Sequence, residues 1–159
     1  MKTSQPFESA KENILDDAIQ LNVQIPHGNP ELVNFSSTAE VFHAVFENSL
    51  YANCIGNSNG KTLEANETVC KIFGYTEEEM IQLSTKEIFD ITENRYEEYL
   101  AVREFNGKAR AEVTGIRKNG ERFPCKISSV IFTDDNGERR IINTIHDISK
   151  RYIDTAYRS

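Results

Sequence analysis

The alternation of apolar and polar positions along the chain predicts five β-strands. The runs rich in β-type residues lie near 50–57, 61–65, 109–118, 121–133 and 138–148. Asn-Gly dipeptides separate several of these runs, at 59–60, 119–120 and 136–137. Because both residues tolerate positive φ, Asn-Gly favours tight hairpin turns. The first dipeptide therefore predicts one hairpin, and the other two predict three strands in series.

The longest run, FPCKISSVIF, becomes apolar on both faces towards its end. Cys125 and Ile127 alternate with polar neighbours, whereas Val130 and Phe132 make the opposite face apolar as well. A strand that is apolar on both faces indicates that something covers each side of the sheet. In the preceding run the alternation breaks at residue 115, which predicts a β-bulge.

Helix starts are marked by a Ser/Thr-x-x-Glu pattern, in which the two side chains satisfy free backbone N–H groups. The pattern occurs at Ser9–Glu12, Ser37–Glu40, Thr76–Glu79 and Ser84–Glu87. A further helix is predicted after Thr92, with one side formed by Tyr96, Tyr99, Leu100 and Phe105. In CKIFGYTEEEM, Gly74 is predicted to end one helix in the left-handed conformation before Thr76 begins the next.

The predicted element order is helix, two strands, several short helices and three strands. This order is typical of an α+β fold, a five-stranded antiparallel sheet with helices inserted between strands 2 and 3. Pro26, Gly28 and Pro30 interrupt any helix from the N-terminus. We therefore expect an N-terminal helical extension (1–37), one domain (38–149) and the start of a C-terminal linker helix (150–159).

Composition narrows the class of protein. The net charge of −7 and the sequence pI near 5.0 argue against direct binding of nucleic acid, because acidic surfaces repel phosphates. No apolar run approaches the ~18 residues of a membrane span, and MKTSQPFESA lacks the apolar core of a signal peptide. Cytoplasm is the expected location. Three cysteines, widely spaced and odd in number, predict neither a disulfide framework nor a zinc site.

Five short motifs, from about Ala39 to Arg151, resemble the PAS domain family. In order they are VFHAVFENS, GKTLEAN, CKIFGYTEEEM, KNGERFP and HDISKR. The resemblance implies a sensory module that holds a small molecule between the sheet and its helices, or that dimerises through an N-terminal helix. It also implies a downstream kinase, cyclase or regulator domain, in cis or in trans.

The resemblance places a pocket between the inner face of the sheet and the helices within 67–105. Strand alternation and helical spacing give its candidate lining residues: Phe73, Met80, Ile88, Tyr96, Tyr99, Leu100, Cys125, Ile127 and Ser129. An apolar pocket and a packed core have the same composition, so an ordinary core is the alternative for this set.

Two cofactors are disfavoured by missing residues. Haem-binding PAS sensors carry an axial histidine near the stretch that resembles RYEEYL, and Tyr96 stands there instead. Photosensory relatives carry a reactive cysteine after the Gly-Tyr pair, whereas LSTKEIFD has none. A small organic acid, a lipid-like molecule or no ligand all remain open.

No catalytic residue or metal site is predicted, because no Ser/His/Asp arrangement, metal-ligand spacing or P-loop occurs. The same fold class hosts small isomerases and thioesterases, so the alternative function is an enzyme that uses Tyr96 in the same pocket. Asp147 and Ser149 lie where the sheet leads into the next segment. They are candidates for signal transmission or for capping the helix that follows.

Two apolar helix stripes need covering, one in a helix near 10–22 and one formed by Val41, Phe42, Val45 and Phe46. The hypothesis is that one helix covers the outer face of the sheet and the other meets a second copy of the chain. A homodimer is therefore expected.

Overall fold

The computed structural model describes residues 38–151, and these form the predicted α+β fold. The elements in chain order are α2 (Thr38–Asn48), β1 (Ala52–Asn57), β2 (Thr62–Ala65), α3 (Glu67–Phe73), α4 (Glu77–Met80), α5 (Thr85–Ile88), α6 (Asn94–Asn106), β3 (Lys108–Ile116), β4 (Arg122–Thr133) and β5 (Arg139–Asp147). The predicted extension (1–37), with its helix near 10–22, lies outside the described residues, as does most of the predicted linker helix (150–159).

The five strands form one antiparallel sheet in the order β2-β1-β5-β4-β3. The pairing of β3 with β4 runs without a break along all nine residues of β3, so the predicted bulge at residue 115 is wrong. The alternation breaks there because a Cβ on Gly115 would lie 2.5 Å from Cζ of Phe123, which leaves room for glycine alone. The β1–β2 pairing does shift register, between Ile55 and Gly56.

The three Asn-Gly dipeptides lie in three hairpin loops of the same design, as predicted. In the first, the Gly60 N–H donates to the Asn57 C=O, and the Asn57 N–H donates to the Lys61 C=O, both at 3.0 Å. Residues 117–121 and 134–138 repeat this pattern. The loop glycines have φ values of 82°, 88° and 79°. This is the three-residue hairpin loop, in which the last loop residue takes the left-handed conformation.

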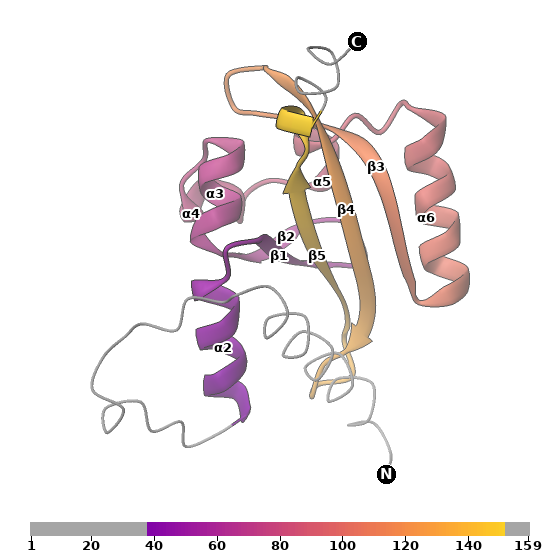
Figure 1. The fold of residues 1–159 in the computed structure, drawn as a ribbon. Helices are drawn as coiled ribbons and strands as arrows, with labels where there is room; N and C mark the ends of the chain where they lie inside the picture. Colours follow the sequence, from indigo (N-terminus) through magenta and orange to yellow (C-terminus); the bar gives the residue numbers. More distant parts are fainter. Residues whose placement is uncertain (1–37, 152–159) are drawn as a thin grey trace.

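The inner face of the sheet is covered by the helices that follow β2 (Figure 1). A chain of aromatic rings fills much of the space between these two layers: Phe123, Phe73, Phe89, Tyr96 and Tyr99. Neighbouring rings in this chain have centroids 5.5 to 6.1 Å apart, the usual range for packed aromatic pairs.

The outer face of the sheet carries a smaller apolar cluster beneath α2. Phe46 packs there with one residue from each of three strands, which are Ile55, Phe132 and Ile142. Phe42 adds its ring 6.1 Å from the Phe46 ring. Both sides of the sheet are therefore covered, as the two apolar faces of the longest strand predicted. Two of the four candidate dimer residues contact their own sheet, while Val41 and Val45 are half-buried.

The inward side of α6 differs from the prediction at its C-terminal end. Tyr96 and Tyr99 are buried and Leu100 packs against the core, but Phe105 is 91% exposed. At ~100° per residue, Phe105 lies ~140° around the helix from Leu100 and so faces solvent. Arg103, four residues after Tyr99, takes the inward position instead.

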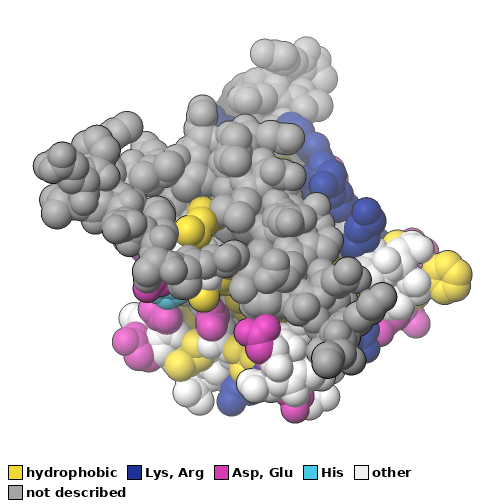
Figure 2. Space-filling model, turned by 90° about the horizontal axis from the view of Figure 1, so that it is seen from below, with side chains coloured by type: hydrophobic (Ala, Val, Ile, Leu, Met, Phe, Trp, Pro, Cys, Tyr) yellow, Lys and Arg dark blue, Asp and Glu magenta, His cyan; other side chains and the backbone are white. Residues whose placement is uncertain are grey.

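The described surface mixes charge types. Seen from below, acidic and hydrophobic side chains are interspersed, and Lys and Arg side chains gather along one side (Figure 2).

Among the helices of residues 38–151, none has the length and apolar character needed to cross a membrane.

Candidate ligand pocket and the exit from the sheet

A pocket of about 530 Å³ opens beside the aromatic core. Its walls come from β1 and its hairpin turn, from the segment 84–91, from α6, and from the inner face of β5. The volume falls in the range of small-molecule sites, ~300–1,000 Å³. Three of the predicted residues line it: Ile88, Tyr96 and Leu100.

The other six predicted residues lie in the packed part of the inner face. They are Phe73, Met80, Tyr99, Cys125, Ile127 and Ser129, and each is buried. Their part in ligand binding stays a prediction. The lining also contains polar residues that the apolar pattern did not predict, notably Thr85, Arg103 and Asn143. Spacing offered a signal for Arg103, because it follows Tyr96 by seven residues, two turns of helix.

A buried polar chain connects α6 to the pocket wall. Ser129 Oγ donates to Asn143 Oδ1, and because a hydroxyl has one proton, the Tyr99 hydroxyl donates to Ser129. The Asn143 Nδ2 atom lies 3.9 Å from Cys54 Sγ. Burial raises the pKa of Tyr99 and raises the pKa of the Cys54 thiol to about 12. These groups are therefore neutral hydrogen-bonding groups rather than nucleophiles at neutral pH.

Arg103 brings a cation to the pocket on the α6 side. Its side chain is 11% exposed, and its Cζ lies 5.6 Å from the centroid of the Tyr99 ring. Its Nη2 lies 3.9 Å from Glu104 Oε1, at the edge of ion-pair distance. The Glu104 Oε2 atom bonds Arg139 instead. Within the described part of the chain, the buried Nε of Arg103 has no hydrogen-bond partner.

Tyr96 has the chemistry of a positioned hydroxyl and not of a base. Burial raises its pKa, and a hydrogen bond with Thr85 counters only part of that effect. A general base works best when its pKa is near the working pH. The described residues contain no group of three His, Cys, Asp or Glu side chains that could hold a metal ion.

Backbone hydrogen bonds connect the hairpin wall of the pocket to the wall at α5. The Thr62 N–H donates to the Leu83 C=O and the Thr85 N–H donates to the Gly60 C=O, both at 3.0 Å. A Cβ on Gly60 would lie 2.8 Å from Thr85 Oγ1, so the turn and α5 are in close contact.

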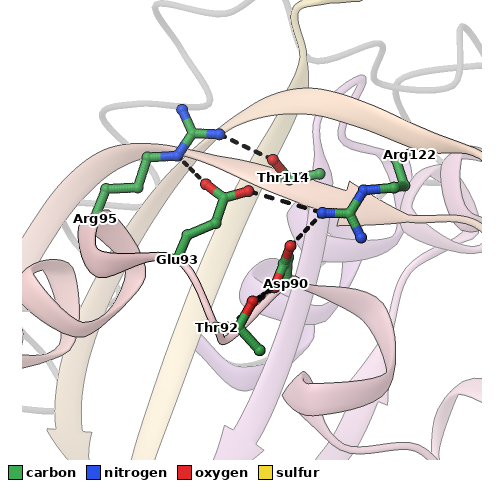
Figure 3. A network of polar contacts seen from close by, with 6 residues as sticks. All are labelled: Asp90, Thr92, Glu93, Arg95, Thr114 and Arg122. Carbon is green, nitrogen blue, oxygen red and sulfur yellow. Dashed lines mark hydrogen bonds and ion pairs between the residues drawn. The ribbon is translucent and has the colours of Figure 1, made fainter.

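A network of polar side chains holds the loop between α5 and α6 (Figure 3). Asp90 accepts hydrogen bonds from the N–H and hydroxyl of Thr92, and it pairs with Arg122 of β4. These bonds lower the pKa of Asp90 to about 2, and the hydrogen bond from the Thr92 hydroxyl has the largest effect. The loop carries Ile91, which is 46% exposed and lines the pocket, so the network positions part of the pocket mouth.

The same network reaches β3. Glu93 pairs with Arg95 and lies 4.0 Å from Arg122. The Arg95 Nη2 atom donates to Thr114 Oγ1 at 2.9 Å. The start of α6 is thereby connected to the neighbouring strand.

The two candidate transmission residues contact each other at the exit from the sheet. Asp147 Oδ1 accepts from the Ser149 N–H at 2.9 Å and from the Ser149 hydroxyl. Its Oδ2 accepts from Arg117 Nη2 at 2.8 Å. Burial would raise the pKa of Asp147, but the hydrogen bonds from Arg117 and Ser149 outweigh it and lower the pKa. Ser149 is the first helical residue, so these bonds connect the end of β5 to the segment that follows the sheet.

Arg117 connects this exit to the corner at Gly74. Its Nη1 donates to the Ile72 C=O at 2.6 Å, and its Cζ lies 3.9 Å from the centroid of the Phe123 ring. Gly74 ends α3 with φ 82°, and Thr76 begins α4 with both bonds of the predicted capping box. The predicted corner between two short helices is confirmed.

Comparison with known proteins decides the family. The sequence profile of the PAS domain matches residues 51–150. The chain belongs to the PAS domain family. PAS homologues are sensory signal-transduction modules, generally without catalytic activity, and many form part of kinases or regulators. No curated protein matches the chain.

Solved PAS domains share the fold. A PAS domain from Colwellia psychrerythraea is 19% identical with a TM-score of 0.65, covering 72% of this chain and 99% of that one. A domain of a sensory box histidine kinase/response regulator from Geobacter sulfurreducens is 22% identical with a TM-score of 0.58, covering 72% and 98%. A PAS domain of a LuxR-family transcriptional regulator from Burkholderia thailandensis, solved in complex with ethanol, is 17% identical with a TM-score of 0.58, covering 67% and 96%.

Proposed function

We propose that this PAS domain senses a small molecule in the pocket between the β1–β2 hairpin, α5, α6 and β5. The observation that supports this function is the 530 Å³ pocket beside a densely packed core. Its lining combines apolar side chains such as Ile88 and Leu100 with the polar groups of Arg103 and Asn143. A concave site of this volume that combines apolar surface with converging polar groups is suited to a small molecule.

The aromatic rings offer a route from the pocket towards the exit. Tyr96 lines the pocket, and its ring centroid lies 6.1 Å from that of Phe89. The ring centroids of Phe89 and Phe73 lie 5.8 Å apart. The Phe73 ring lies 5.5 Å from Phe123. A ligand that shifts Tyr96 would therefore press on a continuous row of packed rings.

The row ends at the charged contact of the exit. Arg117 lies over Phe123 and pairs with Asp147, which holds Ser149. A displaced ring would change this pair, and with it the start of the segment that leads to an effector. We propose a kinase, cyclase or regulator domain as that effector, in cis or in trans.

The test of sensing is to denature the purified chain and identify released small molecules by mass spectrometry. Leu100→Phe places a larger side chain in the pocket, and Val102→Phe makes a similar change at a 46% exposed site of the same helix. The wild type and Val102→Phe should release a molecule that Leu100→Phe retains poorly. Equal release from all three proteins would contradict sensing in this pocket, and so would no release from any of them combined with no binding of an added small molecule.

We also propose a homodimer through α2, which is supported by half-buried Val41 and Val45 beside the ring pair that contacts the sheet. Light scattering on the full chain should give the mass of a dimer, and a monomeric mass would refute this proposal. The cytoplasmic location stays a prediction from the sequence. No observation favours the enzyme alternative, because burial raises the pKa of Tyr96 away from the range of a general base.

A further inference from the structure

Arg103 places a buried positive charge at the pocket, where its described partners are Glu104 and Tyr99. Its contact with Glu104 is long, at 3.9 Å, and Glu104 bonds Arg139 with its other oxygen. The Nε atom is buried without a hydrogen-bond partner in the described part of the chain. A buried charge destabilises the fold unless it is paired and hydrogen-bonded, so such a guanidinium favours an incoming anion.

A second donor lies in the same wall. Asn143 uses its Oδ1 atom to accept from Ser129, which leaves its Nδ2 hydrogens facing Cys54 Sγ at 3.9 Å. Sulfur is a weak acceptor, so this amide group can donate to a ligand oxygen. Both Asn143 and Arg103 line the pocket.

The remaining lining sets the shape and charge of a ligand. Ile88, Leu100 and Ile141 provide apolar surface. At the mouth, exposed Lys86 and exposed Glu97 carry opposite charges that offset each other. The pocket therefore combines a positive charge at its buried wall with an apolar surface, and further polar side chains come from the hairpin turn and from residues 84–86.

We propose that the pocket binds a small organic carboxylate, with its carboxylate on Arg103 and Asn143 and its apolar body against Ile88 and Leu100. The proposal rests on the proposed function, because it names the ligand class of the same pocket. A guanidinium matches the planar carboxylate with two parallel hydrogen bonds. A single buried cation balances one carboxylate, whereas a phosphate group carries up to two negative charges.

The experiment compares carboxylates with their neutral amides of the same shape. The full chain is titrated by calorimetry with phenylacetate and phenylacetamide, and with hexanoate and hexanamide. At least one carboxylate should bind with a Kd below about 1 mM and at least about tenfold more tightly than its amide. Inorganic phosphate should not compete, and competition as strong as that of the carboxylate would overturn the proposal in favour of phosphate recognition.

Two variants test whether Arg103 supplies the positive charge that binds the carboxylate. Arg103→Gln should weaken carboxylate binding at least about tenfold, while Arg110→Gln, which removes a charge from an exposed position of β3, should leave it unchanged. If Arg103→Gln does not fold, the comparison of carboxylates with amides on the wild type still tests whether the pocket prefers a carboxylate. Amides that bind as tightly as the acids would overturn the proposal that the ligand is a carboxylate, and would leave the proposal of small-molecule sensing intact. Absence of binding by every probe, together with no released molecule, would refute both the carboxylate proposal and the proposal of small-molecule sensing.

Discussion

The inner face of the sheet has two ends that differ in packing. At one end, the rings of Phe73, Phe89 and Phe123 fill the space so closely that Gly115 has no room for a Cβ. At the other end, Arg103 and Asn143 line an open pocket. Under the proposed function, stability and ligand recognition are separated along one sheet. Substitutions at the packed end should reduce stability, and those at the pocket end should mainly change binding.

The largest loss of stability is expected from Phe73→Ala at the packed end. Removal of a fully buried ring leaves a cavity and should lower the free energy of unfolding by ~3–5 kcal/mol. Phe105→Ala makes the same chemical change at a 91% exposed site, and should stay within ~0.5 kcal/mol of wild type. Urea denaturation measures both variants, and equal losses would contradict the assignment of these two side chains.

Gly74→Val should give the second largest loss, because valine is strained at the φ of 82° that ends α3. We expect a decrease of ~1–3 kcal/mol in the free energy of unfolding. Gly74→Asn is the control, since asparagine accepts the left-handed conformation and should lose much less. An equal loss from both substitutions would contradict left-handed strain as the cause.

Asp147→Asn should lower the free energy of unfolding by a smaller amount, ~1–2 kcal/mol at pH 7, because it weakens hydrogen bonds to a charged group. The folded protein lowers the pKa of Asp147, so the carboxylate adds stability above its unfolded pKa of ~3.9. That stability is lost as the pH falls through the lower folded pKa.

The difference between wild type and Asp147→Asn should therefore be constant from pH 7 to pH 5 and shrink below about pH 4. Urea denaturation at several pH values measures it. Ser128→Ala, on the strand that pairs with β5, provides a comparison without a titrating group. A difference that grows towards low pH would show that the sign of the Asp147 contribution is wrong.

The sequence predicted the fold well because its signals are local. The glycine in each hairpin loop and the Thr76 capping box act through neighbouring backbone atoms, so short motifs suffice to recognise them. The pocket is different. Phe73 and Ile88 are equally apolar in sequence, yet one is packed among rings and the other faces a cavity.

Whether space is filled depends on side chains brought together from distant parts of the chain. Ser129 and Asn143 meet across two strands, and alternation alone predicted only the inward direction of Ser129. Arg103 was missed because a charged residue is normally expected on the surface. Phe105 was misplaced for the converse reason, since an aromatic residue is normally expected inside.

The smallest effect on stability is expected at the pocket mouth. Arg122→Gln removes an exposed ion pair with Asp90, which should change the free energy of unfolding by less than ~1 kcal/mol. The loop that carries Ile91 should nevertheless open more often, because Arg122 connects it to β4. Hydrogen exchange should therefore become faster at residues 90–93 and stay unchanged in the packed strands. Arg139→Gln, which removes the exposed pair with Glu104, is the matched control and should leave that loop protected. Unchanged exchange at 90–93 in Arg122→Gln would mean that the loop is held by its own turn through Thr92, and that the mouth of the pocket is as rigid as its packed end.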